Sequence, residues 1–155
     1  MVDGYGLIAL NPKPRTIQAA PTATKPNWIM DVSVPIYIES RYRVNRKRVK
    51  QVVSDTVRKN GIVTPVEVSI AIVGNRKMRV LNKKYRGIDK TTNVLSFSQN
   101  EGERVPRPLD KLYLGDVVIS YPVVIEEAAL EKMLVDDKIA ELVEHGVKHL
   151  LGEHH

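Results

Sequence analysis

The chain has 155 residues, of which 43% are apolar and 27% are charged, and these values suit one soluble domain with a proper core. It has no cysteine, which excludes disulfides and thiolate metal sites, so any metal must be held by His, Asp, Glu or water. No stretch approaches the roughly 20 apolar residues of a membrane helix. We therefore expect no membrane association, and the lack of cysteine fits a cytoplasmic protein.

The net charge of +6 is spread unevenly along the chain. Residues 41–59 carry eight Lys and Arg against one Asp, and residues 75–90 carry seven against one. Residues 121–155 reverse this balance, with eight Asp and Glu against three Lys. The asymmetry indicates a polyanionic partner on one side of the molecule, although solvated helix faces account for the charges equally well.

The first 29 residues are predicted to be a flexible tail. They contain four prolines and no periodic apolar pattern. Because Met30 directly precedes the first ordered-looking segment, a start placed too early is an alternative explanation for this tail. The folded domain is expected to span residues 30–155.

Apolar periodicity predicts four strands and four helices in that domain. The strands are expected at residues 32–38, 66–73, 93–97 and 114–120, and Pro35 places the first of them at a sheet edge. The first helix is expected from an Asn45 cap to Gly61, and the second follows Gly74 with Asn75 as its cap. A third helix with Pro122 at its first position runs to about Leu134, and a fourth opens at Asp136 or Asp137. This order predicts an α+β fold, with a small sheet packed on helices.

The last eleven residues contain all four histidines of the chain. His145 and His149 are four residues apart, so they lie on one face of the final helix. His155 follows beyond Gly152, a residue that can end a helix and turn the chain by taking a positive φ. Three histidines in this spacing predict a Zn²⁺ site with an open fourth position for water, although a purification tag would explain His154 and His155.

The same spacing occurs in zinc peptidases of the H-E-x-x-H-x-x-G-x-x-H type, so spacing alone leaves peptidase and nuclease open. A peptidase needs Glu after the first histidine as its general base, and this chain has Gly146 there. Glu144 lies about 100° away around the helix, which makes it a poor substitute. Basic residues before the histidine motif also suit RNA better than a peptide.

Three motifs resemble the YbeY family of metal-dependent endoribonucleases. They run from Arg79 to Phe97 (RVLNKKYRGIDKTTNVLSF), from Leu114 to Ser120 (LGDVVIS), and from His145 to His155 (HGVKHLLGEHH). The resemblance covers about residues 31–155. It implies an α+β fold in which a C-terminal zinc-bearing helix lies beside a small, mixed, four-stranded sheet.

The resemblance also implies site residues and partners. His145, His149 and His155 would bind one Zn²⁺, and Arg86 would be the functional arginine on the floor of a basic cleft. The implied activity is cleavage of single-stranded RNA, in 3′-end maturation of the small-subunit ribosomal RNA and in ribosome quality control. The small ribosomal subunit is the implied partner, and DNA is not expected. Further residues are candidates for binding substrate: Lys83, Lys84, Lys90, Asn93 and Ser96.

The chain departs from the family pattern around its third histidine. His154 stands where the family usually has Asp, Lys148 stands where it usually has Leu, and the sequence stops at His155. Loss of the Asp removes a hydrogen bond that would orient a ligand, so we expect weaker metal binding. His154 or the terminal carboxylate is an alternative ligand.

A zinc ion held by three histidines lowers the pKa of its bound water towards about 7. The resulting hydroxide would either attack a phosphodiester or take the proton of a ribose 2′-OH, and Arg86 would stabilise charge on the phosphoryl oxygens. Alone, Arg86 is equally an ordinary arginine at a helix C-terminus. The alternative from another class is a non-catalytic RNA-binding or ribosome-binding protein whose zinc is structural.

Overall fold

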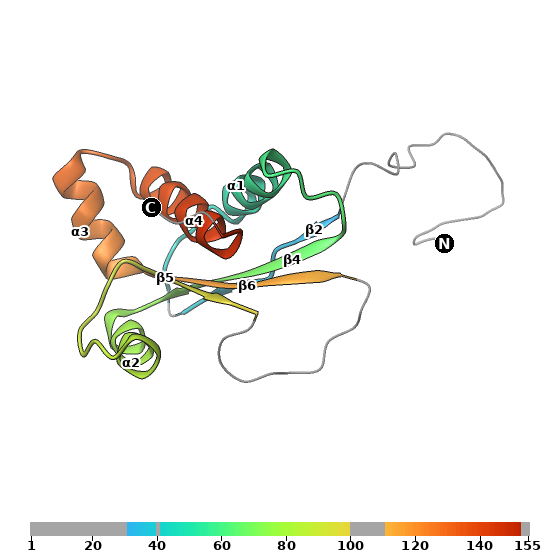
Figure 1. The fold of residues 1–155 in the computed structure, drawn as a ribbon. Coiled ribbons are helices and arrows are strands. Elements are labelled where there is room, and N and C mark those ends of the chain that lie inside the picture. Colours follow the sequence, from blue (N-terminus) through green and yellow to red (C-terminus); the bar gives the residue numbers. More distant parts are fainter. Residues whose placement is uncertain (1–30, 40, 100–110, 153–155) are drawn as a thin grey trace, which may run out of the picture.

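The fold is taken from a computed structural model, which describes residues 31–39, 41–99 and 111–152 (Figure 1). Two parallel strands, β4 (Val66–Val73) and β6 (Leu112–Ser120), form the centre of its sheet. β5 (Val94–Ser98) pairs antiparallel with β6 at one edge. β2 (Val32–Ser33) and β3 (Ile36–Ile38) pair parallel with β4 on the other side. The mixed α+β architecture predicted above is confirmed.

Among the described residues the sheet has five strands where four were expected, because the first expected strand is interrupted at Val34 and Pro35. Proline has no N–H to donate to a strand ladder. The carbonyl of Pro35 still accepts a hydrogen bond from the Ile70 N–H at 2.9 Å, and pairing with β4 resumes at Ile36. The predicted edge position of this segment is confirmed among the described residues.

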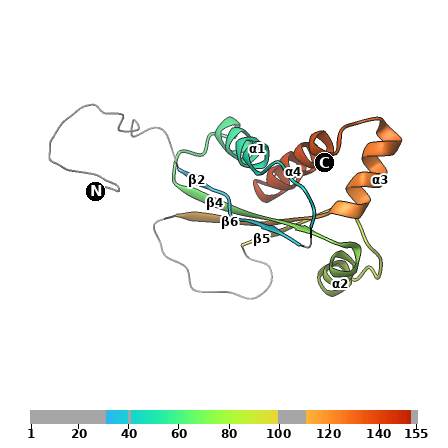
Figure 2. The same ribbon diagram turned by 180° about the vertical axis from the view of Figure 1, so that it is seen from behind.

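Helices cover both faces of the sheet (Figures 1 and 2). The first face packs against α1 (Arg46–Lys59) and α4 (Val135–Leu150), with α3 (Tyr121–Glu131) beside α4. The opposite face packs against α2 (Asn75–Arg86). Strand alternation produces this division: Val66, Val68, Ile70 and Ile72 of β4 join the large core under α1 and α4, whereas Ala71 and Val73 turn towards α2.

Helix boundaries follow the predicted signals closely but not everywhere. α3 begins at Tyr121, one residue before Pro122, and α4 begins at Val135 rather than at Asp136 or Asp137. Asn45 caps α1 as predicted, since its side chain accepts the Arg48 N–H at 3.0 Å. Asn75 does not cap α2. Gly74 is the cap residue, and the side-chain amide oxygen of Asn75 instead accepts hydrogen bonds from the Ser120 hydroxyl at 2.8 Å and the Thr91 hydroxyl at 3.1 Å. α3 ends at Glu131 rather than near Leu134, because Lys132 takes a left-handed conformation with φ 56°.

Helices in the described part of the chain are all too short or too polar to cross a membrane.

Candidate metal centre and catalytic cleft

The edge strand β5 separates the two faces at which the candidate site residues arise. Its side chains alternate, so Val94 packs with the α4 core and Leu95 and Phe97 pack with α2. Helix α4 lies over β5 and β6 on the first face, and the C-terminus of α2 approaches β5 from the second. Residues about 60 positions apart in sequence are thereby brought to one edge of the sheet.

His145 and His149 lie one turn apart on α4, as their spacing predicted. Their Nε2 atoms are 3.1 Å apart, and their rings meet at 66° with centroids 4.5 Å apart. Two imidazole nitrogens bound to one tetrahedral Zn²⁺ at about 2.0–2.1 Å would lie about 3.3 Å from each other. The observed separation of 3.1 Å is close to this value.

The third predicted ligand, His155, lies outside the described residues, as does His154. Within the described ranges no cluster of three His, Asp or Glu is placed to hold a metal. α4 ends at Leu150, and Gly152 then takes φ 89° while its N–H donates to the His149 carbonyl at 3.0 Å. The positive φ that the histidine motif predicted for Gly152 is confirmed, and the role of His155 stays a prediction.

Arg86 ends α2 and reaches the edge strand. Its Nη2 donates to the Ser96 carbonyl at 2.8 Å and its Nη1 to the Tyr85 carbonyl at 3.2 Å, while the guanidinium lies 5.0 Å from the centre of the Phe97 ring. These contacts fix the plane of the guanidinium. A cavity of about 230 Å³, which we call the histidine cleft, is lined by Arg86, Val94, Leu95, Ser96, His145, Gly146 and His149.

Gly146 is required by the close packing of α4 on β6. A Cβ at this position would lie 2.6 Å from Cγ1 of Val117, a fully buried side chain. The general base of a zinc peptidase would occupy this position, and the structure has no room for it. Glu144, the poor substitute, forms an ion pair with Lys148 at 3.1 Å. The structure therefore adds a steric argument against peptidase chemistry.

The five predicted substrate-binding residues occupy four different places. Ser96 lines the histidine cleft. The ammonium of Lys84 lies 5.0 Å from the Tyr85 ring, and the Asn93 amide donates to Glu127 of α3 at 3.0 Å. Lys83 and Lys90 line a separate space of about 690 Å³ along α2. Only Ser96 among them lies beside both Arg86 and the histidines, and a role in substrate binding stays a prediction for all five.

We call that second space the basic hollow; it is lined by Arg76, Arg79, Lys83 and Lys90 around Asp89. The Arg79 side chain donates to Asp89 at 2.8 Å, and this hydrogen bond holds the pKa of the Asp89 carboxyl below its usual value. Lys83 lies 3.8 Å from the same carboxylate. Four cations against one anion leave the basic hollow strongly positive.

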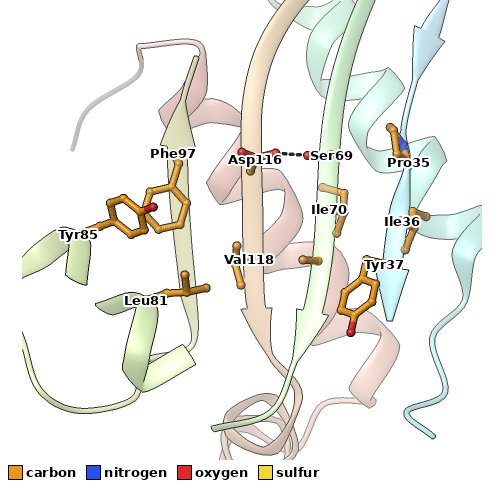
Figure 3. Close-up of a pocket in the computed structure, with 11 residues that line it drawn as sticks. Pro35, Ile36, Tyr37, Ser69, Ile70, Leu81, Tyr85, Phe97, Asp116 and Val118 are labelled. Carbon is orange, nitrogen blue, oxygen red and sulfur yellow. Dashed lines mark hydrogen bonds between the residues drawn. The ribbon is translucent and has the colours of Figure 1, made fainter. Parts of the chain in front are cut away.

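A third cavity, of about 500 Å³, lies on the α2 side of the sheet and was not expected (Figure 3). Aromatic and aliphatic side chains surround a hydrogen-bonded pair, Ser69 and Asp116. The sequence does contain a signal for it, because Ser69 in β4 and Asp116 in β6 are polar positions within mostly apolar strands. Without the register of the two strands, nothing in the sequence places these residues side by side.

Comparison with known proteins links this geometry to one family. The YbeY family model, described as Endoribonuclease YbeY, matches residues 37–155. Endoribonuclease YbeY of Acinetobacter baumannii is 42% identical over 112 residues, which cover 72% of this chain and 71% of that protein. Endoribonuclease YbeY of Roseiflexus castenholzii is 37% identical over 128 residues, covering 81% of this chain and 80% of that protein.

A solution structure of a Thermotoga maritima protein has a similar fold, with a TM-score of 0.52 and 24% sequence identity. The match covers 79% of this chain and 74% of that one.

Proposed function

Because the chain belongs to the YbeY family of endoribonucleases, we propose that it is a zinc-dependent endoribonuclease that cuts single-stranded RNA. Its proposed task is the 3′-end maturation of small-subunit ribosomal RNA and ribosome quality control in the cytoplasm, with the small subunit as partner. One observation carries the proposal: Arg86 and the histidine pair line the same cleft at the edge of β5.

In this proposal Arg86 binds the phosphate that is cut. A guanidinium matches the geometry of phosphoryl oxygens and stabilises the charge that builds up on them during the reaction. The Ser96 and Tyr85 carbonyls hold Arg86 in place before substrate arrives, so little reorganisation is needed.

His145 and His149, with His155 as the expected third ligand, would hold the metal in the same cleft. When bound, Zn²⁺ supplies a Lewis acid and a water of lowered pKa. The 3.1 Å approach of the two imidazoles supports this assignment.

The lysines of α2 and of the loop after it would bind the RNA backbone outside the cleft. Arg76, Arg79, Lys83 and Arg86 recur at intervals of three and four residues, so they share one face of α2. Ten residues of helix span about 15 Å, which is long enough to lie along several phosphates. RNA that follows this face reaches Arg86 and the histidine cleft.

The direct test measures zinc content and cleavage of a single-stranded RNA by the full chain and three variants. His149→Ala should lose zinc and cleavage together. Arg86→Ala should keep its zinc and lose about 10²–10³-fold in rate, as for removal of a group that stabilises developing charge. Arg58→Ala is the matched control, because Arg58 lies exposed on α1 and should behave as the unaltered chain.

The outcomes separate the alternatives. A zinc-loaded chain that binds RNA without cutting it would contradict the nuclease proposal and favour the non-catalytic RNA-binding or ribosome-binding alternative. Cleavage that survives in His149→Ala would show that a contaminating nuclease is responsible.

A further inference from the structure

The unexpected cavity lies over two rows of residues that cross the sheet on its α2 side. The first row is Phe97 of β5, Asp116 of β6 and Ser69 of β4, which are partners in the strand register. The second row, two residues along each strand, is Val118, Ala71 and Tyr37. Strand pairing thus places two polar side chains, Ser69 and Asp116, beside a mostly apolar row, and we call the cavity above them the aromatic pocket.

The side chains around the pocket make it a slot with aromatic walls. Tyr85 and Phe97 stand at one side, with ring centroids 5.0 Å apart, and Tyr37 stands at the other, 54% exposed (Figure 3). The small side chain of Ala71 leaves depth between them. The volume of the aromatic pocket, about 500 Å³, lies within the usual range for small-molecule sites.

The polar end of the pocket is rich in hydrogen-bond acceptors. The Ser69 hydroxyl donates to one oxygen of the Asp116 carboxylate, and Asp116 is an exposed residue. An ionised carboxylate offers about four lone-pair sites, so one donated bond leaves acceptor capacity directed at the pocket. A ligand seated between the aromatic walls would therefore meet acceptors and would need N–H donors along one edge.

The aromatic pocket adjoins the histidine cleft. Phe97 lines the pocket while the guanidinium of Arg86 lies over the ring of the same residue. Tyr85 also lines the pocket, and its carbonyl holds Arg86. An RNA strand whose phosphate contacts Arg86 at the edge of β5 can therefore place a neighbouring base against Phe97, on the α2 side of the sheet.

We propose that the aromatic pocket binds one unpaired base of the RNA substrate, next to the phosphate held by Arg86, and selects it through the Asp116 carboxylate. The proposal rests on the proposed nuclease function. Proteins that read single-stranded RNA stack bases on aromatic side chains and hydrogen-bond their Watson–Crick edges, and this pocket offers both contacts.

The two carboxylate oxygens of Asp116 are hydrogen-bond acceptors, and they determine the expected order of preference among bases. Guanine presents two adjacent N–H donors on its Watson–Crick edge and can pair with both carboxylate oxygens, so it should bind best. Cytosine and adenine offer one amino group each. Uracil places carbonyl oxygens beside its single N–H, and these would face the carboxylate, so it should bind worst.

The first test is a nucleotide titration of the full chain followed by NMR, which needs no cleavage. We use 5′-GMP, 5′-IMP and 5′-UMP, which share the phosphate and differ in the base. 5′-GMP should shift the signals of Tyr37, Ala71 and Phe97 and bind about tenfold or more tightly than 5′-UMP. 5′-IMP lacks the amino group of guanine and should fall between the two.

Two variants and a matched control locate the effect. Asp116→Asn should bring 5′-GMP affinity within about twofold of 5′-UMP, because an amide replaces an acceptor with a donor. Ala71→Leu should fill the slot and weaken every nucleotide without changing charge. Asp55→Asn makes the same charge change on α1, across the sheet, and should leave the preference intact.

The second test compares cleavage of RNA oligonucleotides that differ at one base beside the cut site. The unaltered chain should prefer guanine there, and Asp116→Asn should lose the preference. Cleavage without base preference, together with a flat titration, overturns the pocket proposal and leaves the nuclease proposal standing; a second copy of the chain or a protein partner on this face would give that result. Base-selective binding at the pocket with no cleavage contradicts only the nuclease proposal.

Discussion

At the scale of single residues, Gly146 controls how closely α4, the helix that carries His145 and His149, approaches the sheet. An alanine inside a helix normally stabilises the helix by about 1 kcal/mol relative to glycine. Here its Cβ would meet Cγ1 of Val117 at 2.6 Å, so α4 must move outward. We expect Gly146→Ala to lower the free energy of unfolding by about 1–3 kcal/mol, the usual cost of overpacking, and to weaken zinc binding.

Chemical denaturation and zinc titration of Gly146→Ala measure both effects. The matched control is the double variant Gly146→Ala with Val117→Ala, in which the colliding methyl groups are gone. In the Val117→Ala background the added methyl should cost far less than in the unaltered chain. An equal cost in both backgrounds would show that Val117 is not what limits the approach of α4.

At the scale of elements, Lys138 joins α3 to α4. Only 4% of this residue is exposed, and its Nζ lies 2.9 Å from Glu131, 3.5 Å from Glu141 and 3.8 Å from Glu127. Burial acts to lower the pKa of Lys138, but hydrogen bonding to Glu131 and the charges of the three carboxylates outweigh it, so the pKa is raised. The charged lysine is therefore favoured in the folded state.

We expect Lys138→Met to reduce stability by about 1–2 kcal/mol at pH 7, less than for a fully buried pair because the carboxylates are partly exposed. Because its pKa is raised by folding, Lys138 stabilises the fold at pH values below its unfolded pKa of about 10.4. This stabilisation is lost as the pH rises through the pKa of Lys138 in the folded chain. Denaturation at several pH values should show that the destabilisation caused by Lys138→Met becomes smaller at alkaline pH. Lys132→Met, an exposed neighbour, is the control; an equal loss there would contradict the role of burial.

A second prediction at this scale concerns the charges of α2. Binding of single-stranded RNA should weaken as salt is added. The slope of the logarithm of the affinity against the logarithm of the salt concentration should become shallower by about 0.7 for each phosphate contact removed. The double variant of Lys83→Ala and Lys90→Ala should show a slope reduced by about 0.7 per lysine. A fluorescence titration of uncut RNA across salt concentrations measures this slope. A matched pair on α1, Lys50→Ala and Lys59→Ala, carries the same charge change.

The α1 pair should leave the slope almost unchanged, because α2 carries Arg86 into the histidine cleft and α1 does not. A larger effect from α1 would move the RNA path to the first face of the sheet. Equal effects from both helices would indicate non-specific attraction by net charge.

At the scale of the whole molecule, local sequence signals predicted most elements but few contacts between them. Alternation located β4, the Asn45 cap located the start of α1, and the histidine spacing placed His145 and His149 on one face of a final helix, α4. These features depend on neighbouring residues. The contact of Arg86 with the Ser96 carbonyl and the pairing of Ser69 with Asp116 depend on strand register and helix placement, which no local pattern encodes.

The extent of the folding unit is the last prediction at this scale. The family match begins at residue 37, and the described sheet begins at Val32, so the proline-containing segment 1–29 should add little stability. A chain that starts at Met30 should melt at the same temperature as the full chain and cut RNA at the same rate. Calorimetry and the cleavage assay measure these two properties.

The control deletes residues 1–34. It removes β2, the Asp31 carbonyl that accepts the Val66 N–H at 3.0 Å, and Val34, which is 7% exposed in the core. This larger deletion should lower the melting temperature clearly, since it exposes the edge of β4 and part of the core beneath α1. Equal losses from both deletions would mean that residues 1–29 pack on the domain, and they would contradict the tail predicted from the sequence.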